Sequence, residues 1–183
     1  MPFNPDIHHR RSVRLQGWDY SSPGMYYITI CTHRRACLFG DVIDGEMRLN
    51  NLGRIAHDEW IRTENVRRNV DLDLFVVMPN HVHLLFVLNE QDSVGATRRV
   101  APTTGGPTPS GPKSGSVGAI IGQYKPCVTR QINTLRSTSE ARVWQRSFHD
   151  HIVRTESDLN RIRRYVAENP RKWHLDSDNP DNW

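Results

Sequence analysis

The stretch FVVMPNHVHLLFVL, residues 75–88, limits the possible folds more than any other part of the chain. Runs of β-branched, aromatic and aliphatic residues stand on both sides of Pro79 and Asn80, a pair that favours a tight turn. The segments VDLDLFVVM and HVHLLFVL therefore predict two antiparallel strands in the interior of a sheet. Two imidazoles, His81 and His83, interrupt the second strand, where a purely structural sequence would carry apolar residues.

Strand and helix patterns alternate along the rest of the chain. Before the histidine strand, the sequence predicts a strand at 25–33, a short hairpin at 38–50 around Asp44-Gly45, and a helix at 51–66 capped by Asn51. After it, the sequence predicts a partly helical segment at 117–135, which Pro126 is expected to kink or shorten. A strand at 141–154 and a charged amphipathic helix at 156–169, which ends before Pro170, complete the chain. An antiparallel sheet with helices on one face accommodates this order most simply. The predicted fold class is α+β, ferredoxin-like.

Length and composition predict one globular domain over residues 1–183, with 37% hydrophobic content. We expect a basic arm over 1–20 and a flexible loop at 93–116, which is rich in Gly, Pro, Ser and Thr. No apolar stretch approaches the roughly 20 residues that span a bilayer, and the start is polar and basic, so a cytoplasmic location without membrane contact is expected. The three cysteines show no C-x-x-C spacing, which supports neither a disulfide framework nor a zinc site.

The positive charge of the chain is concentrated in three places and favours a polyanionic partner. The net charge is +4, and no acidic residue occurs between Asp92 and Glu140. Lys and Arg bind phosphates with release of counterions, which suits a nucleic acid. The candidate DNA contacts are Arg10, Arg11, Arg14, Lys125, Arg130, Arg161 and Arg164, and Trp18, Tyr20 and Trp144 are candidates for stacking on bases or for core packing.

The two histidines of the second strand point to the same side of the sheet, because residues two apart in a strand share a face. Two imidazoles at this spacing can hold one divalent cation. The alternative is that His81 and His83 lie on a strand surface that faces solvent. His149 and His151 form a second H-x-H pair and compete as ligands.

The last predicted helix offers a partner for the histidines. Tyr165 and Asn169 are four residues apart and share one helix face. The amide oxygen of an Asn suits Mg²⁺ or Mn²⁺, and a phenol is a potential nucleophile. The alternatives are a tyrosine at a helix interface and an ordinary helix end before proline.

Several separated segments resemble the REP-associated tyrosine transposases, a branch of the single-tyrosine HUH transposases. The resemblance rests on MPNHVHLLF, RLQGWDYSSPGMYYITICTHRRACLFGDV, GEMRLNNLGRIAHDEW, VWQRSFHDHIVR and IRRYVAENPRKWHLDSDNP. They occur in the order of that family and cover most of the chain from Arg11 onwards, outside the 93–116 loop.

The resemblance implies a role for each matching residue. His81 and His83 match the metal-binding pair, Asn169 the third protein ligand, and Tyr165 the nucleophile. Lys125 matches a basic position after an aromatic residue, here Tyr124, which we interpret as a packing or DNA-contact residue. Pro126 departs from the family pattern.

The activity that the resemblance implies is cleavage and rejoining of single-stranded DNA at hairpins of repetitive palindromes. It would proceed through a 5′-phosphotyrosine intermediate with Mg²⁺ or Mn²⁺ as cofactor, in a monomer or a homodimer. Two other classes are less well supported by the residues. A non-catalytic ferredoxin-like nucleic-acid-binding module would carry aromatic residues where His81 and His83 stand. A zinc hydrolase would need a general base near the pair, and there is no H-E-x-x-H motif.

Overall fold

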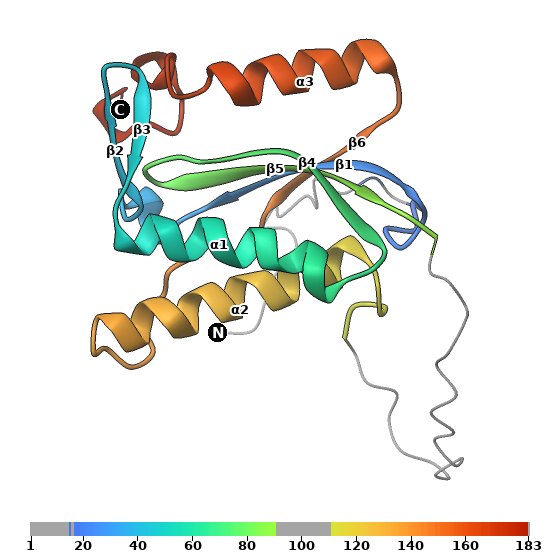
Figure 1. Ribbon diagram of the computed structural model, residues 1–183, viewed down its shortest axis with the longest axis horizontal. Coiled ribbons are helices and arrows are strands. Elements are labelled where there is room, and N and C mark those ends of the chain that lie inside the picture. The colour runs from blue at the N-terminus through green and yellow to red at the C-terminus, as the bar shows by residue number, and fades with distance from the viewer. Residues whose placement is uncertain (1–14, 16, 91–110, 183) are drawn as a thin grey trace, which may run out of the picture.

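The protein is described by a computed structural model over residues 15, 17–90 and 111–182 (Figure 1). Its strands and α-helices are β1 (Gly24–Cys31), β2 (Gly40–Ile43), β3 (Glu46–Leu49), α1 (Asn51–Val66), β4 (Val70–Val77), β5 (His81–Leu88), α2 (Val117–Leu135), β6 (His149–Val153) and α3 (Glu156–Glu168). Short 3-10 helices lie at His33–Arg35, Trp173–Leu175 and Pro180–Asn182. The predicted contacts Arg10, Arg11 and Arg14, and the predicted loop as far as residue 110, lie outside these ranges.

Four strands form one antiparallel sheet in the order β4-β5-β1-β6. With α1 between β1 and β4 and α2 between β5 and β6, this is the β-α-β-β-α-β arrangement of ferredoxin-like folds. The predicted α+β class is therefore confirmed. The β2–β3 hairpin is separate, and its tip is at the predicted Asp44-Gly45, where φ is 53° and 75° as a type I′ turn requires.

The helices cover both faces of the sheet. α1 and α2 lie on one face and α3 lies alone on the other (Figure 1). The larger apolar cluster, which includes Ile28, Leu84 and Trp60, fills the α1 and α2 side, and a smaller one contains Ile162 and Val166 of α3. The expectation that all helices share one face is wrong for α3. The reason is that Ile162 and Val166 form an apolar stripe one turn apart, which the sheet's second face buries.

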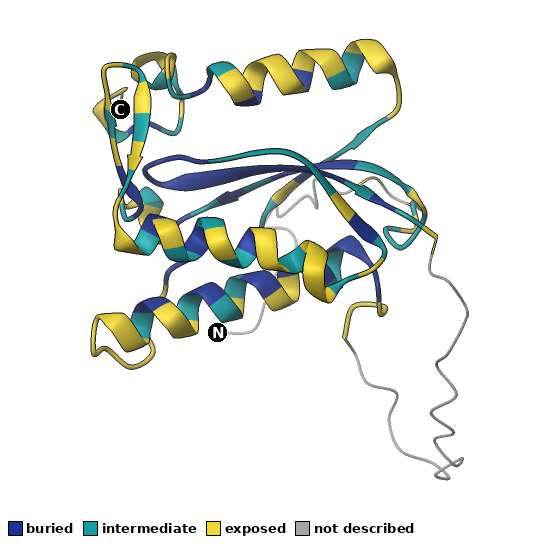
Figure 2. Ribbon diagram, in the orientation of Figure 1, coloured by how far each residue is buried: buried dark blue, intermediate teal, exposed yellow. Residues whose placement is uncertain are grey.

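The exposed residues of the helices lie mostly on the sides turned away from the sheet, whereas β5 is buried along nearly its whole length (Figure 2). β5 is a central strand with helices on both sides, which explains the lack of polar alternation in its sequence. None of the helices in the described ranges is long and apolar enough to cross a membrane.

Helix ends differ slightly from the predictions. The cap of α1 is Asn50 rather than Asn51, and its side chain accepts hydrogen bonds from the N–H groups of Leu52 and Gly53 at 2.9 and 3.0 Å. α2 continues through Pro126. Pro126 cannot bond the carbonyl of Gly122, but both residues are exposed, so water can take that bond.

The strand predicted at 141–154 is shorter in the structure and covers only His149–Val153. Thr29 of β1 pairs with His149, and Thr32 forms a bridge with Trp144. Between these two pairs, β1 has two residues, Ile30 and Cys31, whereas the opposite segment has four, residues 145–148. Lys125 accounts for this departure, because its Nζ donates to the carbonyls of Gln145 and Arg146 at 2.6 and 3.1 Å. The segment 145–148 thereby bulges out of the sheet next to β1.

Candidate metal and tyrosine site

The two histidines of β5 are buried and lie side by side on the face of the sheet that α3 covers. His81 is 0% exposed and His83 is 2% exposed. Their Nε2 atoms are 3.0 Å apart, and their ring planes are inclined at 65°. The alternative of a solvent-facing strand surface is therefore wrong.

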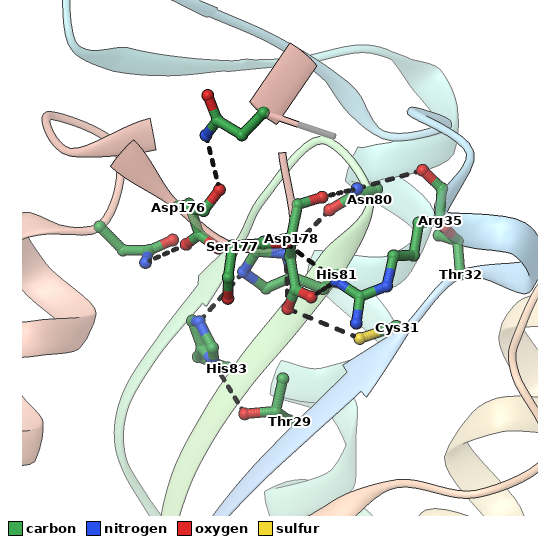
Figure 3. Close-up of polar contacts among 12 residues, drawn as sticks. Thr29, Cys31, Thr32, Arg35, Asn80, His81, His83, Asp176, Ser177 and Asp178 are labelled. Atoms are coloured by element: carbon green, nitrogen blue, oxygen red, sulfur yellow. Dashed lines mark hydrogen bonds and ion pairs between the residues drawn. The ribbon is translucent and has the colours of Figure 1, made fainter. Parts of the chain in front are cut away.

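Asn80 fixes the orientation of the His81 ring. The Nδ2 of Asn80 donates to the carbonyls of Arg35 and Asp178 at 3.1 and 2.6 Å, which leaves its Oδ1 to accept from Nδ1 of His81 at 2.9 Å (Figure 3). The proton of the neutral ring therefore lies on Nδ1, and the lone pair of Nε2 is directed toward His83.

The ring of His83 is held by two hydroxyl groups of β1. Its Nδ1 lies 2.7 Å from the hydroxyl of Tyr27 and 2.9 Å from Oγ1 of Thr29. Either hydroxyl can accept a proton from Nδ1. When one does so, Nε2 of His83 also presents a lone pair, opposite that of His81.

Burial keeps both rings neutral at physiological pH. It lowers the pKa of His81 to about 4, against the attraction of Asp176 and the Asn169 amide, which favour protonation. Burial, with the nearby His81 and His149, lowers the pKa of His83 well below its usual value. Neutral imidazoles are the form that binds metal ions. Two adjacent ligands of an octahedral ion bonded at roughly 2.1 Å stand about 3.0 Å apart, which matches the separation of the two Nε2 atoms.

Asn169 directly follows α3 and brings an amide to the same place. It is 3% exposed, and its Nδ2 donates to Oδ2 of Asp176 at 2.9 Å. Its Oδ1 is buried, and no donor within the described residues meets it in hydrogen-bond geometry. A buried oxygen without a donor is costly unless a cation or water meets it. The residues present therefore fit a bound divalent cation.

Asp176 belongs to the same cluster and was not predicted. Ligand atoms of His81, His83 and Asp176 all lie within 4.8 Å of one another. Asp176 is part of the segment after the 3-10 turn Trp173–Leu175, and the ring of Trp173 packs 5.9 Å from that of His81. The cluster thus comprises two imidazoles, an amide and a carboxylate.

Tyr165 lies beside the histidines, one helical turn before Asn169. Its ring centroid is 5.2 Å from that of His83, with the planes inclined at 66°. The side chain is 47% exposed, so a large substrate can reach it. Burial and the negative charge of Asp176 raise the pKa of Tyr165, while the Asn169 amide lowers it. The resting phenol is therefore protonated, and it stands next to the histidines of its own chain.

A cleft of about 1070 Å³ opens between the sheet and α3, and Tyr165 and His83 line its wall. Three arginines, Arg35, Arg146 and Arg161, line it as well. Arg35 forms an ion pair with Asp178 and Arg161 with Asp158. Arg146 is exposed and forms no ion pair with any described carboxylate. Asp150 also lines the cleft, so Arg146 supplies a cation available to a phosphate but does not make the whole lining positive.

The second histidine pair lies on the same sheet face but apart from the cluster. His149 and His151 are opposite Thr29 and Tyr27 in the β1–β6 register. The Nε2 of His151 is 2.6 Å from Oδ2 of Asp158, which also pairs with Arg161. Neither histidine belongs to the group of described residues whose ligand atoms converge. Both line the cleft.

The predicted DNA contacts within the described ranges have different surroundings. Arg161 lines the cleft, and Arg130 and Arg164 are exposed elsewhere. Lys125 is half-buried, and burial lowers its pKa. Its bonds to the carbonyls of Gln145 and Arg146 make it a support for the cleft wall, while a phosphate contact of Lys125 stays a prediction.

The aromatic candidates for base stacking mostly belong to the interior. Trp144 is 6% exposed and donates through Nε1 to the Lys125 carbonyl at 3.2 Å. Tyr124 is 1% exposed and donates to the Ala56 carbonyl at 3.0 Å. Trp18 packs under the guanidinium of Arg154, 5.6 Å from its ring, and Tyr20 packs against the larger apolar cluster.

Sequence reasoning missed Asn80, Arg146 and Asp176 as site residues. Asn80 directly precedes His81, and this adjacency was the available signal. Arg146 was hidden because the segment 141–154 was interpreted as one regular strand. Asp176 lies in a segment without helical or strand periodicity, where no pattern indicates which way a side chain points.

Comparison with known proteins supports the fold and the family. No protein-family model matches the sequence. The chain is 37% identical over 175 residues to an uncharacterized protein of Haemophilus influenzae, and the aligned region covers 95% of each of the two chains. It belongs to the same family as that protein.

The solved structures that are similar to this chain include two transposases. One is a REP-associated tyrosine transposase bound to a REP hairpin, with a TM-score of 0.54 and 17% identity, over 87% of this chain and 74% of that one. The other is a putative transposase of Deinococcus radiodurans, with a TM-score of 0.42 and 16% identity, over 84% and 95% of the two chains. The first likeness confirms that the chain has the fold of a REP-associated tyrosine transposase, as the sequence resemblance predicted.

Proposed function

We propose that this protein is a metal-dependent transposase that cleaves and rejoins single-stranded DNA at hairpins through a phosphotyrosine intermediate. One observation carries the proposal: the exposed phenol of Tyr165 stands beside the His81 and His83 pair, on the same helix face as the buried amide of Asn169. A nucleophile and a neutral set of metal ligands thus meet at the wall of a cleft that three arginines line.

The ion site would consist of His81, His83 and Asn169. A divalent cation there, Mg²⁺ or Mn²⁺, supplies Lewis-acid stabilisation and orientation of the scissile phosphate. The protein's own contribution is to hold the ligands in place. Asn80 sets the His81 tautomer, and the hydroxyls of β1 hold His83.

Tyr165 would supply the attacking oxygen. A bond forms between its Oη and the phosphorus, and the bond from phosphorus to the 3′ oxygen breaks, leaving a 5′-phosphotyrosine and a free 3′-OH. The phenol loses one proton and the leaving oxygen gains one, so the step is balanced without an external energy source. The reverse attack by a 3′-OH rejoins a strand, which makes strand transfer possible.

The cleft offers a path for an unpaired strand. Arg146 and Arg161 both line it, Arg146 from the segment that precedes β6 and Arg161 from α3, one turn before Tyr165. A strand between them would bring a phosphate to the phenol. The likeness in fold to a transposase bound to a REP hairpin supports hairpin DNA as the partner.

The test is formation of a covalent adduct. The full-length protein is incubated with labelled single-stranded DNA from the flanks of its own gene, with MnCl₂ or with EDTA, and analysed on a denaturing gel. We expect an adduct that requires the metal and is abolished by Tyr165→Phe, while DNA binding is retained. Tyr20→Phe, outside the cleft, should form the adduct normally.

Tyr27 provides the sharpest contrast, because it is the other tyrosine that lines the cleft. Burial raises the pKa of Tyr27 far above its usual value, and its hydroxyl is engaged by His83. Tyr27→Phe should therefore slow the reaction without preventing the adduct. An adduct that persists in Tyr165→Phe and disappears in Tyr27→Phe would reverse the assignment of the nucleophile.

A further inference from the structure

Asp176 is bound on both of its carboxylate oxygens by groups that can only donate. Oδ2 accepts from Nδ2 of Asn169 at 2.9 Å, and Oδ1 accepts from the backbone N–H of Asp178 at 2.7 Å. A carboxylate is the side chain that offers two acceptors and no donor. An amide of the same shape would oppose one of these donors with an NH₂ group.

The bond to Asp176 determines which end of the Asn169 amide faces the histidines. Because Nδ2 is engaged by Asp176, Oδ1 is the atom that remains, and it is the buried oxygen that lacks a donor. If the amide turned over, two oxygens would face each other at Asp176, and an NH₂ group would take the place of Oδ1. An NH₂ group is a donor and cannot bind a cation.

The segment that carries Asp176 is itself fastened from several sides. Asp178 forms an ion pair with Arg35, and its carbonyl accepts from Nδ2 of Asn80 at 2.6 Å (Figure 3). Asn179 is buried and donates through Nδ2 to the carbonyl of Trp173 at 3.1 Å. These contacts fix the position of the backbone that carries Asp176.

We infer that Asp176 is a positioning residue, which locks the Asn169 amide with its oxygen toward His81 and His83 and thereby completes the cation site. The inference rests on the proposed function, since the cation is the one assigned to that site. It adds the residues after α3 to the machinery, because the amide of Asn169 has its required direction only while Asp176 is in place.

The competing role for Asp176 is that of a direct ligand, since its carboxylate lies within 4.8 Å of the ring nitrogens. The two roles differ in how Asp176 and Asn169 combine. A positioning residue acts through Asn169, so its removal has no further effect once Asn169 is gone. A direct ligand contributes independently, so the two losses multiply.

The experiment is a double-mutant cycle on Mn²⁺ affinity, measured by titration calorimetry on the full-length protein without DNA. Loss of a group that orients a ligand typically weakens metal binding by about 10-fold to 100-fold. We expect Asn169→Ala and Asp176→Ala each to weaken binding by about 10-fold or more, and the double variant to bind no more weakly than Asn169→Ala alone. Asp181→Ala, an exposed carboxylate of the same segment, should bind as the wild type does.

The outcomes separate this inference from the proposed function. Wild-type protein that fails to bind Mn²⁺ would overturn the cation site itself. Wild-type protein that binds, with Asp176→Ala binding equally well, would overturn only the positioning role. If the Mn²⁺ affinity of the double variant falls by the product of the two single fold-changes, Asp176 is a direct ligand instead.

Asp176→Asn provides a second variant should the alanine variant fail to fold, with circular dichroism as the check. Its amide has one acceptor oxygen and therefore cannot accept from both Asn169 and the Asp178 N–H, so Asp176→Asn should also weaken Mn²⁺ binding. Wild-type affinity in Asp176→Asn would contradict the inference.

Discussion

The two faces of β5 are equally buried at its centre but differ in chemistry. On β5, Val82, Leu84 and Phe86 face α1 and α2 within the larger apolar cluster. The alternate residues His81, His83 and Leu85 face α3. Burial alone therefore does not distinguish a core position from a site position. The distinction lies in the neighbours, which are apolar side chains on one face and hydroxyls, amides and a carboxylate on the other.

The faces also differ in how much apolar surface they enclose. The α1 and α2 face holds twenty buried residues in one apolar cluster, whereas the buried members of the smaller apolar cluster on the α3 face are Tyr27, Leu85, Ile162 and Val166. Because apolar burial is the main source of stability, the first face supports the fold. The α3 face can accommodate polar groups because most of the apolar burial that stabilises the fold lies on the α1 and α2 face.

The largest expected contrast comes from neighbouring residues of β5. Leu84→Ala should lower the free energy of unfolding by about 2–5 kcal/mol, because it leaves a cavity in the larger cluster, while the variant keeps its Mn²⁺ affinity as long as it is folded. His83→Ala should remove Mn²⁺ binding at a smaller loss of stability. Urea unfolding and calorimetry on both variants measure the two effects. Similar effects on both quantities in both variants would mean that the faces are not specialised.

Acidification should destabilise the α3 face of the metal-free protein. The pKa of His81 is about 4 in the folded state, against 6.5 for an unperturbed ring. Above pH 6.5 the ring is neutral in both states. As pH falls from 6.5 toward 4, the unfolded chain binds a proton that the folded chain does not, so the stability decreases. The expected loss from this ring is about 2 kcal/mol between pH 7 and pH 5.

Urea unfolding at the two pH values measures this loss. His81→Gln should flatten the dependence on pH, because its amide does not titrate in this range. His174→Gln, a change at an exposed histidine, should leave the dependence unchanged. Equal slopes for the wild type and His81→Gln would show that the buried ring is not the cause.

The smallest expected effect concerns the open side of the α3 face. Arg146→Ala, made in Tyr165→Phe to prevent cleavage, should weaken binding of single-stranded DNA by about tenfold, or about 1.4 kcal/mol. It should also reduce the salt dependence of binding by about one phosphate contact. Arg68→Ala, an exposed arginine outside the cleft, is the matched control. Fluorescence anisotropy over a range of salt concentrations measures both, and equal losses in the two variants would indicate only a general effect of charge.

Local patterns were sufficient to predict most of the fold. The Asp44-Gly45 turn, the Pro79-Asn80 turn and the amphipathic α3 all depend on residues close in sequence, and the structure has each of them. The placement of α3 on the opposite face was not predicted. It depends on Tyr27 of β1 and Leu85 of β5, which give the second face a small apolar patch of its own, and a helix-by-helix interpretation does not consider such a patch.

The candidate site was predictable where its residues are paired by short spacing. His81 with His83, and Tyr165 with Asn169, are each two or four residues apart, and the structure brings the two pairs together. Their roles stay predictions. Asp176 could not be found in this way, because its direction depends on the ion pair between Asp178 and Arg35, two residues far apart in the sequence.

The attachment of α3 has a consequence for the motions of the molecule. Segments that rest on few apolar contacts open locally at lower free energy than the rest of a fold, and α3 rests on the smaller cluster. The helix carries Tyr165 and is followed directly by Asn169, so one opening event withdraws the phenol and the amide from the histidines together. The cation site is therefore incomplete whenever Tyr165 is withdrawn. Hydrogen exchange should show that the backbone amides of α3 and of Asn169 open together as a single unit.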